Sequence, residues 1–206
     1  MNIFQVVLVP LTIFYFGLFS EASSSAKQQR SIVVAVIDDS SKVDFETKSL
    51  VILKSCSICE VRNLSPYDQQ GNFDSKALPS AIAAVQGVSN LLYLGWNKPS
   101  SQDNTDVVEA LKVLIQSGVL VVGLAGTAGV DEPSSPLNKT VLGKVPDLII
   151  IGELKERETL RQRSYFGPEM LTAIQPPKEF MNQGKVGLMF VTRLAQNWSK
   201  KSFSAQ

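Results

Sequence analysis

The sequence of 206 residues contains no histidine and only two cysteines. Histidine is the side chain that most often acts as a general base near neutral pH, and it is the commonest metal ligand. Two cysteines without histidine cannot supply the four ligands of an ordinary zinc site. We therefore expect no metal site, and no motif in the chain calls for a cofactor.

A marked excess of charge of either sign is also missing. Lysine and arginine number 20 against 19 acidic residues, which gives a net charge of +1. This balance gives no electrostatic reason to expect a nucleic-acid partner, and the pair Lys200-Lys201 is too short to form a basic patch. The hydrophobic fraction of 44% is typical of a globular protein, and the length fits one domain, alone or with a leader.

The N-terminus departs from this ordinary composition. Residues 3–19 are nearly all apolar, and Ser20 and Ala22 place small residues at the −3 and −1 positions of a signal-peptidase site. Met1 and Asn2 supply no basic residue, and the apolar run is at the short limit for crossing a bilayer. Residues 1–22 are therefore either a cleaved signal peptide or a retained N-terminal anchor, followed by a polar linker over residues 23–30.

Either alternative predicts an exported protein, secreted or periplasmic, that meets a membrane only if the leader is uncleaved. The two cysteines, Cys56 and Cys59, form a C-x-x-C pair between segments that have strand character. On an extended segment, residues three apart point to opposite faces, which disfavours a bridge between them. Buried structural cysteines, a local disulfide and redox or metal chemistry remain as alternatives.

Short apolar runs rich in β-branched residues alternate with helical patterns. The runs predict strands at residues 31–37, 51–53, 60–64, 90–94, 119–124 and 148–151. Helices are expected at residues 76–86, capped by Asp74 or Ser75, at residues 103–117, and at residues 185–198. This alternation predicts an α/β domain over residues 31–199, with a mainly parallel sheet flanked by helices in three layers, and a tail over residues 200–206.

Several segments resemble, in the right order, the subtilisin-like (S8-type) serine proteases. Residues 34–38 match the strand that delivers that family's triad aspartate, here Asp38. Residues 91–96 resemble its substrate-lining strand, and residues 110–125 its helix-Gly-strand unit before the oxyanion asparagine. Residues 144–152 and 163–174 resemble the two segments that follow. The resemblance covers residues 31 to about 198 and implies a reduced subtilisin-like fold.

The departures from that family lie at its catalytic positions. Nothing resembles the family's histidine helix, and residues 39–55 are too short to hold it. The oxyanion asparagine is replaced by Thr127, and the best match to the nucleophile segment places Val186 where the serine should stand. A serine protease needs both the hydroxyl and a base hydrogen-bonded to it. The resemblance thus implies a protease scaffold that has lost its catalytic residues.

Asp38 also has a plain structural explanation. Aspartate at the carboxyl end of a first parallel strand commonly caps the turn or helix that follows it. Residues 126–129 (Gly-Thr-Ala-Gly) follow a strand but lack the phosphate-binding glycine pattern and a Walker lysine. The carboxylates Glu153, Glu156 and Glu158 cluster in sequence, although a glycosidase pair would have to face each other across a cleft.

Three functional hypotheses follow. The first is a pseudoprotease that binds an extended peptide or a protein partner in a groove lined by Tyr93, Leu94, Gly95 and Trp96, with Thr127 at its end. The second is a serine-type endopeptidase or hydrolase relative whose activity is residual or replaced. The third is a purely structural or degenerating gene product.

Overall fold

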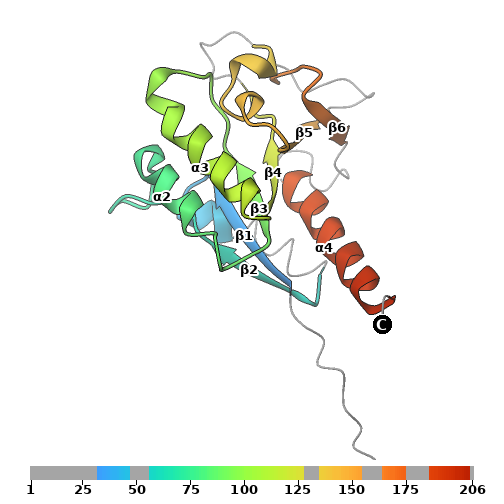
Figure 1. Cartoon of the computed structure of the whole chain (residues 1–206). Helices are drawn as coiled ribbons and strands as arrows, with labels where there is room; N and C mark the ends of the chain where they lie inside the picture. The colour runs from blue at the N-terminus through green and yellow to red at the C-terminus, as the bar shows by residue number, and fades with distance from the viewer. Residues whose placement is uncertain (1–31, 47–55, 128–134, 155–163, 175–185, 205–206) are drawn as a thin grey trace, which may run out of the picture.

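The computed structural model describes residues 32–46, 56–127, 135–154, 164–174 and 186–204. Within them, six strands form one sheet in the order β2-β1-β3-β4-β5-β6, and every neighbouring pair is parallel. The strands are β1 (Ile32–Asp38), β2 (Cys59–Asn63), β3 (Leu91–Gly95), β4 (Leu120–Leu124), β5 (Ile149–Glu153) and β6 (Met170–Ile174). Figure 1 shows them with the helices around them. The predicted α/β class with a parallel sheet is confirmed.

Helices cover both faces of the sheet. Two of them, α2 (Leu78–Ala83) and α3 (Thr105–Gln116), pack together on one face, and α4 (Val186–Ser204) crosses the other. Because successive residues of a strand point to opposite faces, each strand feeds two separate cores. In β1, Ala35 and Ile37 join the α2/α3 core, whereas Val34 and Val36 join the core beneath α4.

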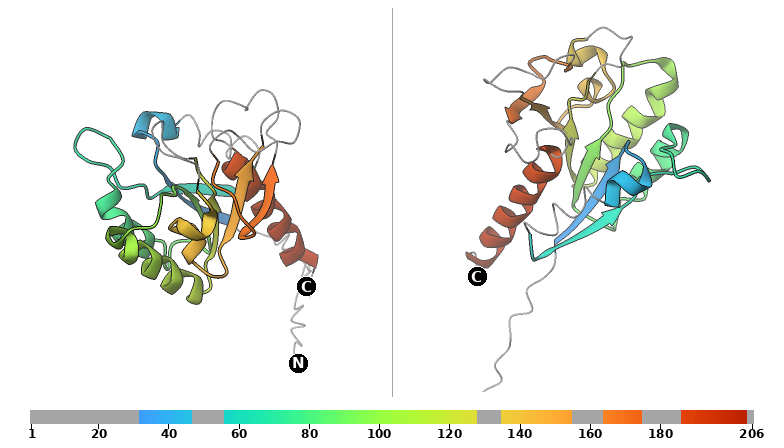
Figure 2. Two further views of the ribbon diagram at one scale, coloured as in Figure 1. Left: turned by 90° about the horizontal axis from the view of Figure 1, so that it is seen from above. Right: turned by 180° about the vertical axis from the view of Figure 1, so that it is seen from behind.

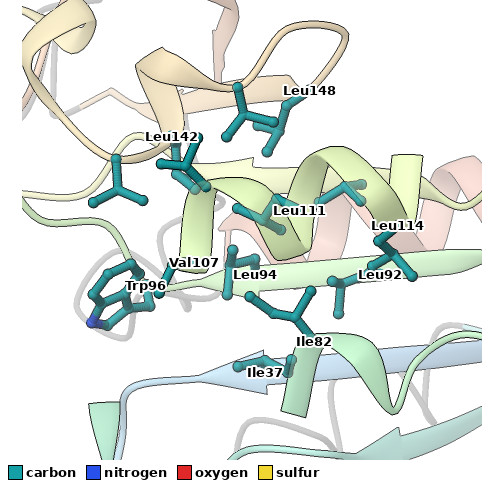
Figure 3. Close-up of a cluster of buried hydrophobic side chains, with 14 of the residues drawn as sticks. Ile37, Ile82, Leu92, Leu94, Trp96, Val107, Leu111, Leu114, Leu142 and Leu148 are labelled. Atoms are coloured by element: carbon teal, nitrogen blue, oxygen red, sulfur yellow. The ribbon is translucent and has the colours of Figure 1, made fainter. Parts of the chain in front are cut away.

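The α2/α3 core is built mainly from leucine and valine. Leu111 and Leu114 of α3 lie over Leu92 and Leu94 of β3, and Ile82 of α2 closes the space beside them (Figure 3). All of these side chains are at most 2% exposed. Burial of a leucine side chain contributes about 2 kcal/mol, so this layer fixes α2 and α3 to the sheet.

The predicted helices lie where their sequence signals place them. A 3-10 turn, η1 (Ser75–Ala77), precedes α2, and its cap Asp74 accepts a hydrogen bond from the Lys76 amide at 3.0 Å. Pro79 falls in the first turn of α2, where its missing amide costs nothing. α4 runs to Ser204, into the predicted tail, because no glycine or proline interrupts residues 199–204.

Two elements of the structure are not predicted by the sequence patterns, and three predicted segments lie outside the described residues. Strand β6 was not predicted as a strand: its residues are exposed or half-buried, so they show neither a continuous apolar run nor a clear alternation. Residues 42–46 are helical, capped by Ser41, whose hydroxyl oxygen accepts from the Asp44 amide at 3.3 Å. The predicted leader, linker and strand at residues 51–53 lie outside the described residues.

Among the residues that the structure describes, no helix combines the length and apolar character needed to cross a bilayer.

The two cysteines form a disulfide. Cys56 and Cys59 are joined, with Cα atoms 5.3 Å apart, and both are buried. The expectation that an extended segment keeps their side chains apart is wrong, because residues 56–59 form a turn: the Cys59 amide donates to the Cys56 carbonyl at 3.1 Å. This turn leads directly into β2, so the bridge fixes the start of the edge strand beside β1.

We expect reduction of this disulfide to lower the free energy of unfolding by about 2 kcal/mol, since the bridge closes a very short loop and restrains the unfolded chain only locally. Urea unfolding followed by circular dichroism, with and without a thiol reductant, measures the difference. The double variant Cys56→Ser, Cys59→Ser is the control, and its unfolding should not respond to the reductant. A shift of equal size in the control would refute a role for the bridge.

Candidate functional site

The order of the strands defines where a ligand is expected. From β1 the chain adds β2 on one side and then crosses to add β3 on the other, so the connections diverge between β1 and β3. In open parallel sheets, ligands bind outside the carboxyl ends of the strands at such a switch point. Asp38 and Gly95 are paired in register at this place.

Asp38 ends β1 with its side chain buried, at 2% exposed. Its Oδ1 accepts a hydrogen bond from the Ser40 amide at 3.0 Å and another from the Ser40 hydroxyl. The Asp38 amide donates to the Ser65 Oγ at 2.9 Å, which ties β1 to the loop after β2. The aspartate therefore caps the turn that follows its strand, as its plain structural explanation predicts.

Tyr93 of β3 fills the space next to Asp38. Its side chain is 0% exposed and belongs to the core beneath α4. A Cβ atom built at Gly95 would lie 3.1 Å from the Tyr93 Oη and would overlap the Asp38 Oδ2. A Cβ atom built at Gly187 would lie 2.7 Å from the same Oη and would overlap the Tyr93 ring. The phenol thus lies between the end of β1 and the first turn of α4.

The Tyr93 hydroxyl is held in its neutral form. Burial raises its pKa well above the ordinary value, and the negative charges of Asp38, Asp39 and Glu153 raise it further. The oxygen finds no hydrogen-bond partner among the described residues. A buried hydroxyl without a hydrogen-bond partner lowers the free energy of unfolding, so the Tyr93 hydroxyl destabilises the fold.

Val186 is the first residue of α4 and is 1% exposed. Its side chain offers no nucleophilic atom. The next residue, Gly187, is also buried and lies against the Tyr93 ring, so the start of the helix packs directly onto the strand. Among the described residues, the Tyr93 phenol therefore occupies the space between Asp38 and the start of α4.

Thr127 lies at another strand end. It is exposed and forms an isolated antiparallel bridge with Ser164. Gly126 before it has φ of 79°, and a side chain there would press on the Asn97 Cβ at 3.2 Å. Because β4 is two strands from β1, Thr127 belongs to a strand end about 10 Å from that of Asp38.

The predicted peptide groove needs correction. Tyr93 and Leu94 are both 0% exposed, so they do not line an open surface, and β3 is hydrogen-bonded on both edges, to β1 and to β4. A peptide cannot extend the sheet along residues 90–95, because no free edge exists there. Gly95 is half-buried beside Asp38, and Trp96, the first residue after β3, borders a pocket.

That pocket opens at the switch point and has a volume of about 410 Å³. Its walls come from the loops after β1, β2 and β3, and they combine two aromatic rings, two opposite charges and several short polar side chains. The lining residues are Asp39, Ser41, Asn72, Phe73, Ser75, Trp96, Lys98 and Asn104.

A buried side chain, Asn97, holds the base of this region together, and the sequence patterns gave no sign of it. Its Nδ2 donates to the Ala125 carbonyl at 2.7 Å and to the Thr140 Oγ1 at 3.1 Å, and its Oδ1 accepts from the Leu142 amide at 3.2 Å. The amide group thereby joins the ends of β3 and β4 to the segment before β5. An asparagine directly after a predicted buried strand is the only signal that could have pointed to it.

Of the clustered glutamates, Glu153 ends β5 and is buried, while Glu156 and Glu158 lie outside the described residues. In the part of the chain that the structure describes, no three acidic or cysteine side chains come together as a metal site.

The sequence matches no protein-family model, and no match to it was found among curated proteins. Solved structures do match. The crystal structure of a cold adapted subtilisin-like serine proteinase superimposes with a TM-score of 0.55 and 15% identity, covering 82% of this chain and 77% of that one. The protease domain of PatA, solved as a point mutant, gives 0.59 and 12%, covering 87% and 84%.

A lanthipeptide protease gives a TM-score of 0.53 and 13% identity, and there the match covers 71% of this chain but only 56% of the other. At these identities the likeness concerns the fold alone. The parallel six-stranded sheet, flanked by α2 and α3 on one face and by α4 on the other, is therefore a subtilisin-like fold.

Proposed function

We propose that this protein is an exported pseudoprotease, which uses a subtilisin-like scaffold to bind an extended peptide or a protein partner without cutting it. The observation that carries the proposal is the position of Tyr93. Its ring occupies the space between Asp38 and the start of α4, where a proteolytic mechanism would need a base and a hydroxyl. The apolar leader and the disulfide support export, since disulfides persist in oxidising compartments.

The pocket at the switch point supports binding. Phe73, which is half-buried, provides flat apolar surface, and the buried Trp96 borders the pocket with one edge. Asn72 and Asn104 provide amide groups that can pair with a peptide backbone. Lys98 adds a cation and Asp39 an anion on exposed positions. A pocket with a few polar groups around aromatic walls is typical of ligand sites.

The alternative of a hydrolase with replaced activity would rest on Asp38 and the hydroxyl that pairs with it. That hydroxyl belongs to Ser40 and is part of the capped turn, donating to the same oxygen as the Ser40 amide. A serine in such a turn is held by the carboxylate as part of the backbone cap. The geometry thus favours binding over hydrolysis.

We expect no cleavage of casein or of fluorogenic peptides by the purified protein. The control is Asp38→Asn, which keeps the Oδ1 acceptor of the turn and therefore the local fold. Both proteins should release fluorescence at the rate of buffer alone. Hydrolysis by the wild type that disappears in Asp38→Asn would overturn the pseudoprotease proposal.

Peptide binding is tested with a displayed library of random decapeptides. We expect enrichment on the wild type and a loss of affinity of about tenfold or more in the double variant Phe73→Ala, Lys98→Ala, since truncation of a buried aromatic anchor typically costs more than 1 kcal/mol. The matched control is Lys112→Ala, Val113→Ala on the outer face of α3, where Val113 is 57% exposed. Equal enrichment on wild type and pocket variant would contradict this site.

Removing the Tyr93 hydroxyl should stabilise the protein. We expect Tyr93→Phe to raise the free energy of unfolding by about 1 kcal/mol, because the variant no longer buries an unpartnered polar group, whereas Tyr93→Ala should cost about 3–5 kcal/mol through the cavity that it leaves. Urea unfolding monitored by circular dichroism gives both values.

The pH dependence of the free energy of unfolding tests whether the buried Tyr93 hydroxyl causes this difference. The pKa of Tyr93 is raised in the folded state above its value of about 10 in the unfolded chain. The stability that comes from keeping the phenol protonated is therefore fully present below pH 10, and it is lost as the pH rises through the folded-state pKa. Above pH 10 the wild type should lose stability more steeply than Tyr93→Phe. Parallel curves for the two proteins would show that the phenol is not buried as described.

A further inference from the structure

The amino end of the sheet holds a second, chemically different pocket. It has a volume of about 380 Å³ and lies between the start of β1, the connection from α2 to β3, and α4. Its lining contains no charged residue: Ile32, Val33, Gly87, Val88, Ser89, Asn90, Leu91 and Trp198. Nothing in the proposed peptide-binding function involves this end of the molecule.

Trp198 stands at the border of this pocket. Its side chain is 41% exposed, while the other tryptophan, Trp96, is 3% exposed in the core. Tryptophan is enriched where a protein meets the headgroup level of a bilayer, because the indole is apolar with one polar edge. An exposed indole beside an uncharged pocket with both polar and apolar lining is compatible with that level of a membrane.

The start of β1 lies at the same pocket. Ile32 follows directly after the polar linker, and residues 20–31 separate it from the apolar run at residues 3–19. Twelve residues reach no farther than about 40 Å even when fully extended. If the apolar run is the retained anchor, the pocket and Trp198 are therefore confined close to the bilayer surface.

The charges around Trp198 suit an anionic surface. Residues 193–206 contain Arg193, Lys200 and Lys201 and no acidic residue. Both lysines belong to the last turns of α4, whose backbone continues as a helix for about 9 Å past Trp198. Figure 1 shows this end of α4 extending away from the sheet toward the C-terminus. On the strand beside β1, Glu60 is ion-paired to Arg62 at 2.8 Å and leaves little net charge.

We infer that the protein remains anchored by residues 3–19 and rests on an anionic lipid bilayer with the amino end of its sheet, Trp198 and the end of α4 against the lipid. Each lysine near such a surface strengthens the contact roughly fivefold. The partner is the bilayer surface itself, and the inference does not depend on whether the carboxyl-end pocket binds peptides.

The test uses the full chain reconstituted into vesicles of phosphatidylglycerol mixed with brominated phosphatidylcholine, whose bromine quenches tryptophan only at close range. We expect strong quenching of the wild type and little quenching of Trp198→Phe, in which only the buried Trp96 remains. Lys200→Gln, Lys201→Gln should show weaker quenching, as should the wild type in vesicles without phosphatidylglycerol. The matched control, Lys42→Gln, Lys76→Gln at the opposite end of the sheet, should behave like the wild type.

Two outcomes would overturn the inference. One is equal quenching of the wild type and Trp198→Phe, which would place Trp198 away from the lipid. The other is an intact mass, measured on protein isolated from cell membranes, that corresponds to a chain starting at residue 23, because the anchor would then be removed. Failure of peptide binding would leave both readouts unchanged.

Discussion

The contact between the Tyr93 ring and Gly187 sets the geometry at the carboxyl end of the sheet. Only a residue without a side chain lets α4 approach the phenol, and Gly95 is required for the same reason beside Asp38. Two glycines and one tyrosine thus lock the first turn of the helix against the ends of β1 and β3. The same contact fills the space between Asp38 and the start of α4 with the Tyr93 ring.

The central position of β3 constrains how the proposed partner would be recognised. With β1 on one edge and β4 on the other, β3 has no backbone groups to offer, and recognition must come from side chains on the loops beyond it. The loop after β3 is fixed at its base by Asn97, whose side-chain amide joins it to the end of β4 and to the segment before β5. A rigid base under polar loops lowers the entropy cost of binding, because fewer groups have to be ordered.

Elements with a strong local hydrophobic pattern in the sequence could be predicted, and elements without one could not. The β-branched run at residues 31–37 and the amphipathic pattern at residues 103–117 gave β1 and α3 to within two residues, because burial on the sheet depends on those patterns. β6 was missed, since an edge strand with exposed side chains shows no such pattern. The disulfide was misjudged because a turn of four residues, which the flanking strands conceal, brings Cys56 and Cys59 together.

The site was harder to predict, since it depends on which strands are neighbours. Alternation along β3 already implies that Tyr93 and Leu94 face opposite layers, so they could not both line one groove. That Tyr93 faces α4, and that Gly187 is the residue opposite it, follows only from the packing of a helix more than ninety residues later in the chain. Asp38 was interpreted correctly as a turn cap because its partner Ser40 is local in sequence.

A parallel sheet also separates the two proposed surfaces. All strands run the same way, so the chain enters at the amino end while the polar pocket lies at the carboxyl end. Along β1 the seven residues from Ile32 to Asp38 span about 23 Å. A domain that rests on a bilayer by its amino end therefore holds Asp39, Lys98 and the aromatic walls of the pocket toward the aqueous side. An extended peptide can reach that pocket without contact with the lipid, so each surface can be altered without changing the other.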